Sequence, residues 1–148
     1  DEQNIYSIDG YFKAYFPEQP VLHKKFENEF GTFVFYNYQE IFSNLQYVSN
    51  YVILKENPKD HKSFLYRIIH GTAMSWNWNV IKYEQIKHDG NHEIYYVSKT
   101  IKDDELFYEC GVAAIKDSIY FQWVVEEFDG MVEAERIFNE KVKYFKVL

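Results

Sequence analysis

Cys110 is the most reactive side chain that this sequence offers, because a cysteine thiolate is a strong nucleophile. The alternation of the surrounding segment places Cys110 on one face of a strand with Tyr108 and Val112, and Glu109 on the other face. No histidine lies close in the sequence to act as its base. We therefore interpret Cys110 as a small buried apolar side chain, and as the only cysteine it cannot form an internal disulfide.

Histidines and carboxylates that could bind a metal are few and poorly spaced. His88, Asp89 and His92 would lie across a hairpin, but their spacing matches no zinc signature. His61 and His70 are nine residues apart, so they do not share a helix face as an i, i+4 pair does. The sequence also lacks the GxSxG, GxGxxG, P-loop and HExxH motifs. We therefore predict that the protein is not an enzyme and uses no metal ion and no cofactor.

Acidic side chains gather around the last predicted turn of the chain. These residues are Glu126, Glu127, Asp129, Glu133 and Glu135. A calcium loop requires oxygen ligands at regular spacing and a glycine at its sharp bend, and this pattern is absent. The acidic cluster is therefore either a solvated rim or a face that docks a basic protein partner.

Aromatic residues are unusually frequent, with 14 Tyr, 13 Phe and 3 Trp. If the segments 30–39 and 45–55 pair as adjacent strands, four tyrosines become neighbours. These are Tyr36, Tyr38, Tyr47 and Tyr51. They form either a half-buried ladder beneath a helix or an exposed patch for protein recognition, where Tyr and Trp are enriched. Trp76 and Trp78 lie in a predicted loop and favour the exposed patch.

The chain of 148 residues carries a net charge of −7 and is long enough to bury the core of one domain. A nucleic-acid-binding surface is basic, so this charge argues against that class of partner. No apolar run approaches the roughly 20 residues of a transmembrane helix. The sequence begins at Asp1 without a methionine, so we expect a mature chain whose signal peptide has been removed, and a lipid anchor before Asp1 is left open.

Strands are expected to dominate the fold. Three strand-like segments follow one another at 94–101, 106–115 and 119–128. The short polar turns between them predict antiparallel pairing. Further strands are expected before residue 56 and over residues 80–87. We therefore predict one α+β domain, residues 1–148, with an antiparallel sheet of about seven to eight strands, or alternatively a β-barrel with an external helix.

Two helices are expected to pack on this sheet. The first spans about 58–71, begins at Asp60 or Asn57 and fades by Gly71. The second spans about 131–145 and carries an apolar stripe that should seal the inner side of the sheet. The stripe consists of Val132, Ile137, Phe138, Val142 and Phe145.

The opening of the chain carries a motif formed by Asp9-Gly10, Phe12, Phe16-Pro17 and Pro20. With these residues it resembles the opening of a family of small exported bacterial domains. A Tyr-rich strand at 46–54, a hairpin at 106–128 and a closing helix that ends at Phe145 follow in the same order. These domains are similar to the PsbP/Mog1-like fold. The resemblance implies that fold, export to the bacterial cell envelope as a periplasmic or secreted protein, and a non-enzymatic accessory or binding role.

These observations predict a non-enzymatic binding domain, with a protein partner favoured over a small ligand. One alternative is a toxin-neutralising immunity protein or inhibitor, which would need an acidic patch with exposed aromatic side chains. Another is a carrier of a lipid or small ligand. A carrier needs a cavity of about 300 Å³ or more lined by Phe and Tyr, whereas a filled core excludes it.

Overall fold

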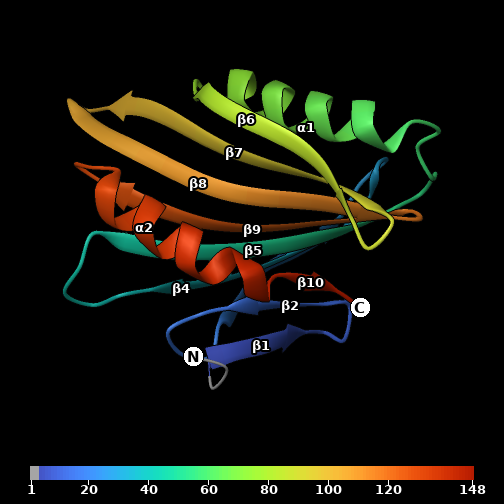
Figure 1. Ribbon diagram of the computed structural model, residues 1–148, viewed down its shortest axis with the longest axis horizontal. Coiled ribbons are helices and arrows are strands. Elements are labelled where there is room, and N and C mark those ends of the chain that lie inside the picture. The colour runs from blue at the N-terminus through green and yellow to red at the C-terminus, as the bar shows by residue number, and fades with distance from the viewer. Residues whose placement is uncertain (1–3) are drawn as a thin grey trace.

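The computed structural model describes residues 4–148, and Asp1, before which a signal peptide is expected, lies outside this range. Figure 1 shows a long twisted antiparallel sheet. Its strand order is β3-β4-β5-β9-β8-β7-β6. The strands are β3 Val21–Glu27, β4 Gly31–Gln39, β5 Leu45–Leu54, β6 Asn79–His88, β7 Asn91–Lys102, β8 Glu105–Lys116 and β9 Ile119–Phe128. The sheet is open, with β3 and β6 at its edges, so the alternative of a closed barrel is wrong.

A second, small sheet joins the two ends of the chain. It has the order β1-β2-β10, in which β1 spans Ile5–Ile8, β2 spans Phe12–Tyr15 and β10 spans Lys146–Val147. The small sheet and helix α2 (Val132–Lys141) lie beside each other on one face of the large sheet. Helix α1 (His61–Ser75) packs on the opposite face, against β6, β7 and β8.

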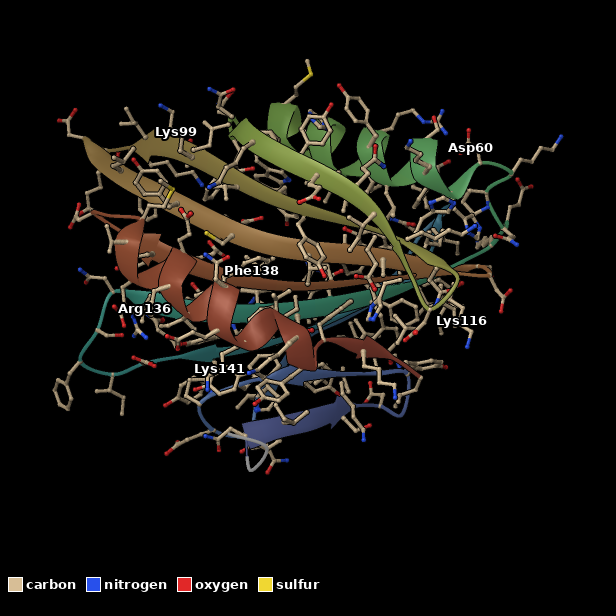
Figure 2. The ribbon with its side chains drawn as sticks, in the orientation of Figure 1. Asp60, Lys99, Lys116, Arg136, Phe138 and Lys141 are labelled. Atoms are coloured by element: carbon tan, nitrogen blue, oxygen red, sulfur yellow. The ribbon has the colours of Figure 1, made fainter. Side chains whose placement is uncertain are left out.

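The face beneath α2 and the small sheet holds the larger core. Trp123 of β9 is fully buried there, and its ring stacks on Phe138 of α2 at a centroid distance of 5.6 Å. Figure 2 shows Phe138 between α2 and the large sheet. The Trp123 indole N–H donates to the Tyr15 carbonyl at 2.8 Å, which ties β2 to β9. The predicted role of the C-terminal helix as a seal is therefore confirmed, although Val132 of its predicted stripe is 84% exposed.

The predicted strands of residues 94–128 are confirmed as β7, β8 and β9. Asp89-Gly90 joins β6 to β7 and Asp103-Asp104 joins β7 to β8, and both pairs adopt the positive φ angles that primed hairpin turns require. Helix α1 begins at the Asp60 cap, whose side chain accepts from the Ser63 N–H at 3.1 Å.

Both helix ends differ from the sequence prediction. Helix α1 does not fade at Gly71 but continues to Ser75, because Ala73 prolongs its buried face of Leu65 and Ile69. Helix α2 ends at Lys141, and the rest of the predicted segment is a 3-10 turn over Val142–Tyr144. Within residues 4–148, no helix is long and apolar enough to cross a membrane.

Candidate functional site

A groove lies between helix α1 and strands β3, β4 and β5. Its volume is about 660 Å³. The side chains that line it are mostly apolar: Phe26, Phe30, Phe33, Phe35, Val52, Leu54, Phe64, Ile68, Trp76 and Tyr120, with His23, Lys24, Asn50, Thr72 and Gln122 among them. The groove exists because α1 packs on the β6–β8 side of this sheet face and leaves the β3–β5 side uncovered.

Strand alternation explains why the floor of the groove is aromatic. Phe33 and Phe35 of β4 point to the α1 face, whereas Val34 between them belongs to the core on the other face. Phe26 of edge strand β3 stacks on Phe33 with ring centroids 4.8 Å apart, which builds the outer wall. Phe30, at the β3–β4 turn, is 63% exposed, so large apolar surface meets water at this wall.

A smaller cavity of about 210 Å³ continues the groove beneath the end of α1. Asn50, Thr72 and Trp76 line both cavities, and the inner one adds Trp78 and two carboxyl groups. These carboxyl groups belong to Glu109 of β8 and Glu126 of β9, which are direct cross-strand partners. The apolar groove therefore ends in a polar, acidic pocket.

A chain of hydrogen bonds crosses the floor of this inner pocket. The Asn50 side-chain amide donates to the Gln122 side-chain oxygen Oε1 at 2.7 Å, and the Gln122 side-chain amide nitrogen donates to the Tyr96 hydroxyl. The Tyr96 hydroxyl in turn donates to Glu109 Oε1 at 2.9 Å. Side chains from β5, β9, β7 and β8 are thus held in one fixed array, with Glu109 at its end.

The two carboxyl groups share an environment that favours their neutral forms. Burial raises the pKa of both Glu109 and Glu126, and the proximity of Glu109 raises the pKa of Glu126 further. The Tyr96 hydrogen bond and the more distant Lys102 act in the opposite direction, on Glu109 and Glu126 respectively. Among residues 4–148, no Lys or Arg nitrogen lies within 4 Å of either carboxyl group.

The four tyrosines predicted to be neighbours are brought together, but their cover differs from the expected one. Tyr38 and Tyr47 are direct cross-strand partners, and Tyr47 and Tyr51 are buried. The small N-terminal sheet, rather than a helix, covers them. Asp9 accepts from the Tyr36 hydroxyl at 2.7 Å and from the Tyr51 hydroxyl at 2.6 Å.

Asp9 of the opening Asp-Gly pair therefore has a structural role. Its carboxylate clamps the small sheet onto β4 and β5 through the two tyrosines. Burial and the Asp9 hydrogen bond raise the pKa of Tyr36 to about 12, and the same two causes raise the pKa of Tyr51.

The two loop tryptophans border the inner pocket. Trp76 ends helix α1 and is 65% exposed, while Trp78 is half-buried at the start of the chain's return to β6. Sequence reasoning placed both in an exposed loop, and the structure adds that both face the cavity that contains Glu109 and Glu126.

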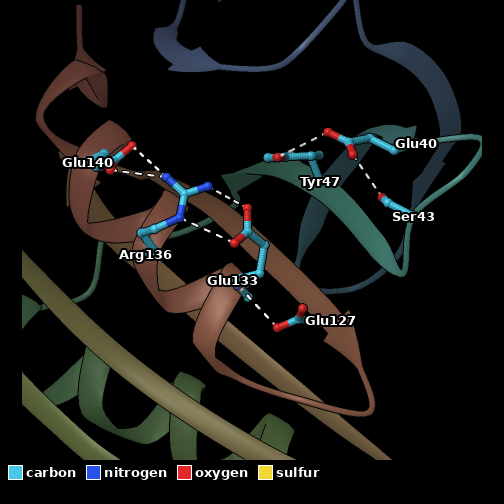
Figure 3. Close-up of polar contacts among 8 residues, drawn as sticks. Glu40, Ser43, Tyr47, Glu127, Glu133, Arg136 and Glu140 are labelled. Atoms are coloured by element: carbon cyan, nitrogen blue, oxygen red, sulfur yellow. Dashed lines mark hydrogen bonds and ion pairs between the residues drawn. The ribbon is translucent and has the colours of Figure 1, made fainter.

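The predicted acidic cluster is divided between the two faces of the sheet. Glu126 lines the inner pocket, whereas Glu127 accepts from the Ala134 N–H at 3.2 Å at the start of α2. Glu133 pairs with Arg136, whose hydrogen bond lowers the pKa of the Glu133 carboxyl (Figure 3). Asp129 lies in a turn with a positive φ. These residues therefore do not form one continuous acidic surface.

The remaining chemically reactive residues belong to the structure of the sheet. Cys110 is fully buried as predicted, and burial raises the pKa of its thiol to about 12. His88 contacts Glu93 at 3.3 Å in the hairpin. Within the described part of the chain, no group of three or more His, Cys, Asp or Glu residues is placed to hold a metal ion.

Sequence reasoning missed Tyr96, Glu109 and Gln122 as site residues. The available signal was that carboxyl and amide groups occupy the α1-facing positions of β8 and β9, strands that are otherwise apolar on that face. What could not be deduced was that α1 sits off-centre and leaves those positions open to a cavity.

Comparison with known proteins bears on the fold. The solution structure of cyanobacterial PsbP (CyanoP) from Synechocystis sp. PCC 6803 matches with a TM-score of 0.67. The match covers 97% of this chain and 91% of that chain, at 11% sequence identity. The chain has a PsbP-like fold. No family model and no curated protein matches the sequence.

Proposed function

We propose that this protein is a non-catalytic, exported binding domain, and that the groove beside α1 is its binding site for a small ligand with an apolar body. The observation that carries this proposal is the groove of about 660 Å³ with its mostly aromatic lining. Its volume lies within the range of ligand pockets in proteins, roughly 300–1,000 Å³. The carrier alternative of the sequence analysis required such a cavity.

The polar groups of the groove also suit a binding site. Ligand pockets are mostly apolar and hold a few polar groups that fix the orientation of the ligand. Here Asn50, Thr72 and Gln122 are the polar groups at the junction of the two cavities. Asn50 and Gln122 are already oriented by the hydrogen bond between them.

Export to the cell envelope and an accessory role are part of the proposal. The resemblance of the Asp9–Pro20 segment to exported bacterial domains supports them, and the PsbP-like fold agrees with that resemblance. Fold likeness alone does not define a function, so these points require their own test. Fractionation of the source cells should recover the protein in the envelope or medium, and recovery in the cytoplasm would refute export.

The binding site is tested by filling the groove. Thr72 lines both cavities, so Thr72→Trp should obstruct them, whereas Met74→Trp places the same side chain on the same helix at an 80% exposed position. Decanol serves as a neutral apolar probe, followed by tryptophan fluorescence or calorimetry. We expect the wild type and Met74→Trp to bind decanol and Thr72→Trp to bind it at least tenfold more weakly. Equal decanol binding by all three proteins would refute the groove as the binding site.

Protein recognition is the second candidate, and edge strand β3 favours it. Val21 and Leu22 are 64% and 51% exposed on β3, and Phe30 follows at the turn. Such an exposed edge can accept a strand from a partner protein. Replacing Leu22 by Lys should abolish binding of a partner protein to edge strand β3 and leave decanol binding unchanged.

A further inference from the structure

The inner pocket at the end of the groove differs chemically from the groove itself. It combines two carboxyl groups with the aromatic side chains of Phe35, Trp76, Trp78, Tyr96 and Tyr120. We propose that this pocket recognises an organic cation, so that the ligand of the groove is an apolar chain ending in an ammonium group. This inference rests on the proposed function and adds the charge of the ligand to it.

Glu109 and Glu126 have no cationic side chain as a partner, which is the first feature that favours a bound cation. Like charges directly opposite each other on neighbouring strands destabilise a sheet. Glu109 receives one hydrogen bond, from Tyr96, and among the described residues no donor hydrogen-bonds the Glu126 carboxyl group. No cationic nitrogen of residues 4–148 lies within 4 Å of either group, so no side chain of these residues supplies a positive charge that would stabilise the ionised carboxylates. A bound cation would supply that charge.

The aromatic lining of the inner pocket also favours a cation. A cation over an aromatic face is attracted by the ring quadrupole, most strongly by Trp and Tyr, and aromatic cages recognise quaternary ammonium groups. The pocket places Trp76 and Trp78 on the α1 side and Tyr96 on the floor, next to the carboxyl groups. Aromatic faces and carboxylates in one cavity both favour a positive charge.

The charge of the lining side chains changes along the length of the groove. The charged side chain among the residues that line its outer part is Lys24, an exposed residue of β3 whose ammonium lies 4.9 Å from the centroid of the Phe26 ring. The carboxyl groups lie at the opposite, inner end beneath Trp76. An apolar chain in the groove can therefore place a cationic head group in the inner pocket, whereas an anionic head group would have to remain at the solvent-exposed end.

The test compares three probes with the same ten-carbon chain: decyltrimethylammonium, decanol and decanoate. Each is titrated calorimetrically into the full chain, wild type and Glu126→Gln, below the concentration at which the probe forms micelles. Glu84→Gln is the matched control, because it removes the same charge from an exposed position of β6.

We expect the wild type and Glu84→Gln to bind decyltrimethylammonium at least tenfold more tightly than decanol, and decanoate most weakly. In Glu126→Gln the preference for the cation over decanol should fall several-fold. If decanol binds but the ammonium probe has no advantage, or if Glu126→Gln keeps the full preference, the cation assignment is overturned and the groove stands. If none of the three probes binds the wild type, the proposed function fails and this inference fails with it.

Discussion

The ring of Tyr96 lies directly over Gly111, its cross-strand partner on β8. A β-carbon at residue 111 would lie 2.5 Å from both the Cζ atom and the hydroxyl oxygen of Tyr96. The absence of a side chain at Gly111 thus lets the Tyr96 ring lie along the sheet and reach Glu109. The polar array of the inner pocket depends on this contact.

Replacing Gly111 by Ala should displace the Tyr96 ring and break its hydrogen bond to Glu109. Overpacking a well-packed core typically costs about 1–3 kcal/mol, so we expect a loss of that size in the free energy of unfolding in urea. Gly71→Ala is the matched control, because no atom lies within 4 Å of its added β-carbon and its position is helical. That change should stabilise the protein by about 0.5–1 kcal/mol. If Gly111→Ala leaves the free energy of unfolding unchanged, the Tyr96–Gly111 contact does not have this role.

Asp9→Asn tests the clamp between the small sheet and the large sheet. The amide is nearly the same size but carries no charge, and one of its two acceptors becomes a donor, so the bonds to Tyr36 and Tyr51 cannot both persist. We expect a loss of about 1–2 kcal/mol in urea unfolding, since hydrogen bonds to charged groups are the stronger ones. Asp117→Asn makes the same change at an exposed turn with a similar positive φ, and should alter stability by less than about 0.5 kcal/mol. If the two changes lower the free energy of unfolding equally, Asp9 does not stabilise the contact between the two sheets.

Alkaline pH should lower the free energy of unfolding through Tyr36 and Tyr51, the tyrosines that donate to Asp9. An unfolded tyrosine loses its proton near pH 10, whereas the pKa of Tyr36 in the folded protein is raised to about 12. Between these values the folded state binds the extra proton, so stability falls as the pH rises from about 10 to about 12. Tyr36→Phe should make this fall shallower in urea unfolding measured at several pH values. An unchanged slope would contradict the assignment.

The carboxyl pair predicts a second pH dependence, in the acid-to-neutral range. Unfolded Glu109 and Glu126 lose their protons near pH 4.5, whereas burial raises the pKa of both in the folded protein. The folded state then binds more protons than the unfolded state, so this contribution to stability is lost as the pH rises from about 4.5 through the neutral range. The other titratable side chains that surround the pair are Tyr96, Tyr120 and, at a greater distance, Lys102.

Glu126→Gln removes one member of the pair and should flatten this decline. The difference in unfolding free energy between Glu126→Gln and the wild type should grow in favour of the variant from pH 5 to pH 8. Glu84→Gln, at an exposed position of β6, should show no such growth. A wild-type protein that becomes more stable relative to Glu126→Gln as the pH rises would contradict the raised pKa values.

The sequence is informative about this fold where the determinants are local. Alternating side chains specify β7, β8 and β9, and the turns Asp89-Gly90, Asp103-Asp104 and Asp117-Ser118 specify the hairpins that join β6, β7, β8 and β9 in succession. The small sheet was beyond such reasoning, because β10 joins β2 from the other end of the chain. The prediction that α1 fades by Gly71 is wrong. A glycine weakens a helix, but the tertiary packing of Ala73 outweighs that effect.

The candidate site was only partly accessible from the sequence. The tyrosines of β4 and β5 were correctly grouped, yet their pairing with Asp9 required knowledge of where the N-terminal sheet docks. Trp76, Trp78 and Glu126 were singled out for other reasons and lie together in the inner pocket. The groove itself arises from the off-centre position of α1, for which no residue pattern provides a signal.

The indole N–H resonances of the three tryptophans report most directly on whether a ligand with an apolar chain binds between α1 and β3–β5. Trp76 and Trp78 border the cavity, whereas Trp123 is fully buried on the opposite face of the sheet and serves as an internal control. Titration of the ¹⁵N-labelled protein with decanol or decyltrimethylammonium should shift the Trp76 and Trp78 signals and leave that of Trp123 in place. Saturating probe that shifts only Trp123, or none of the three, would contradict the account.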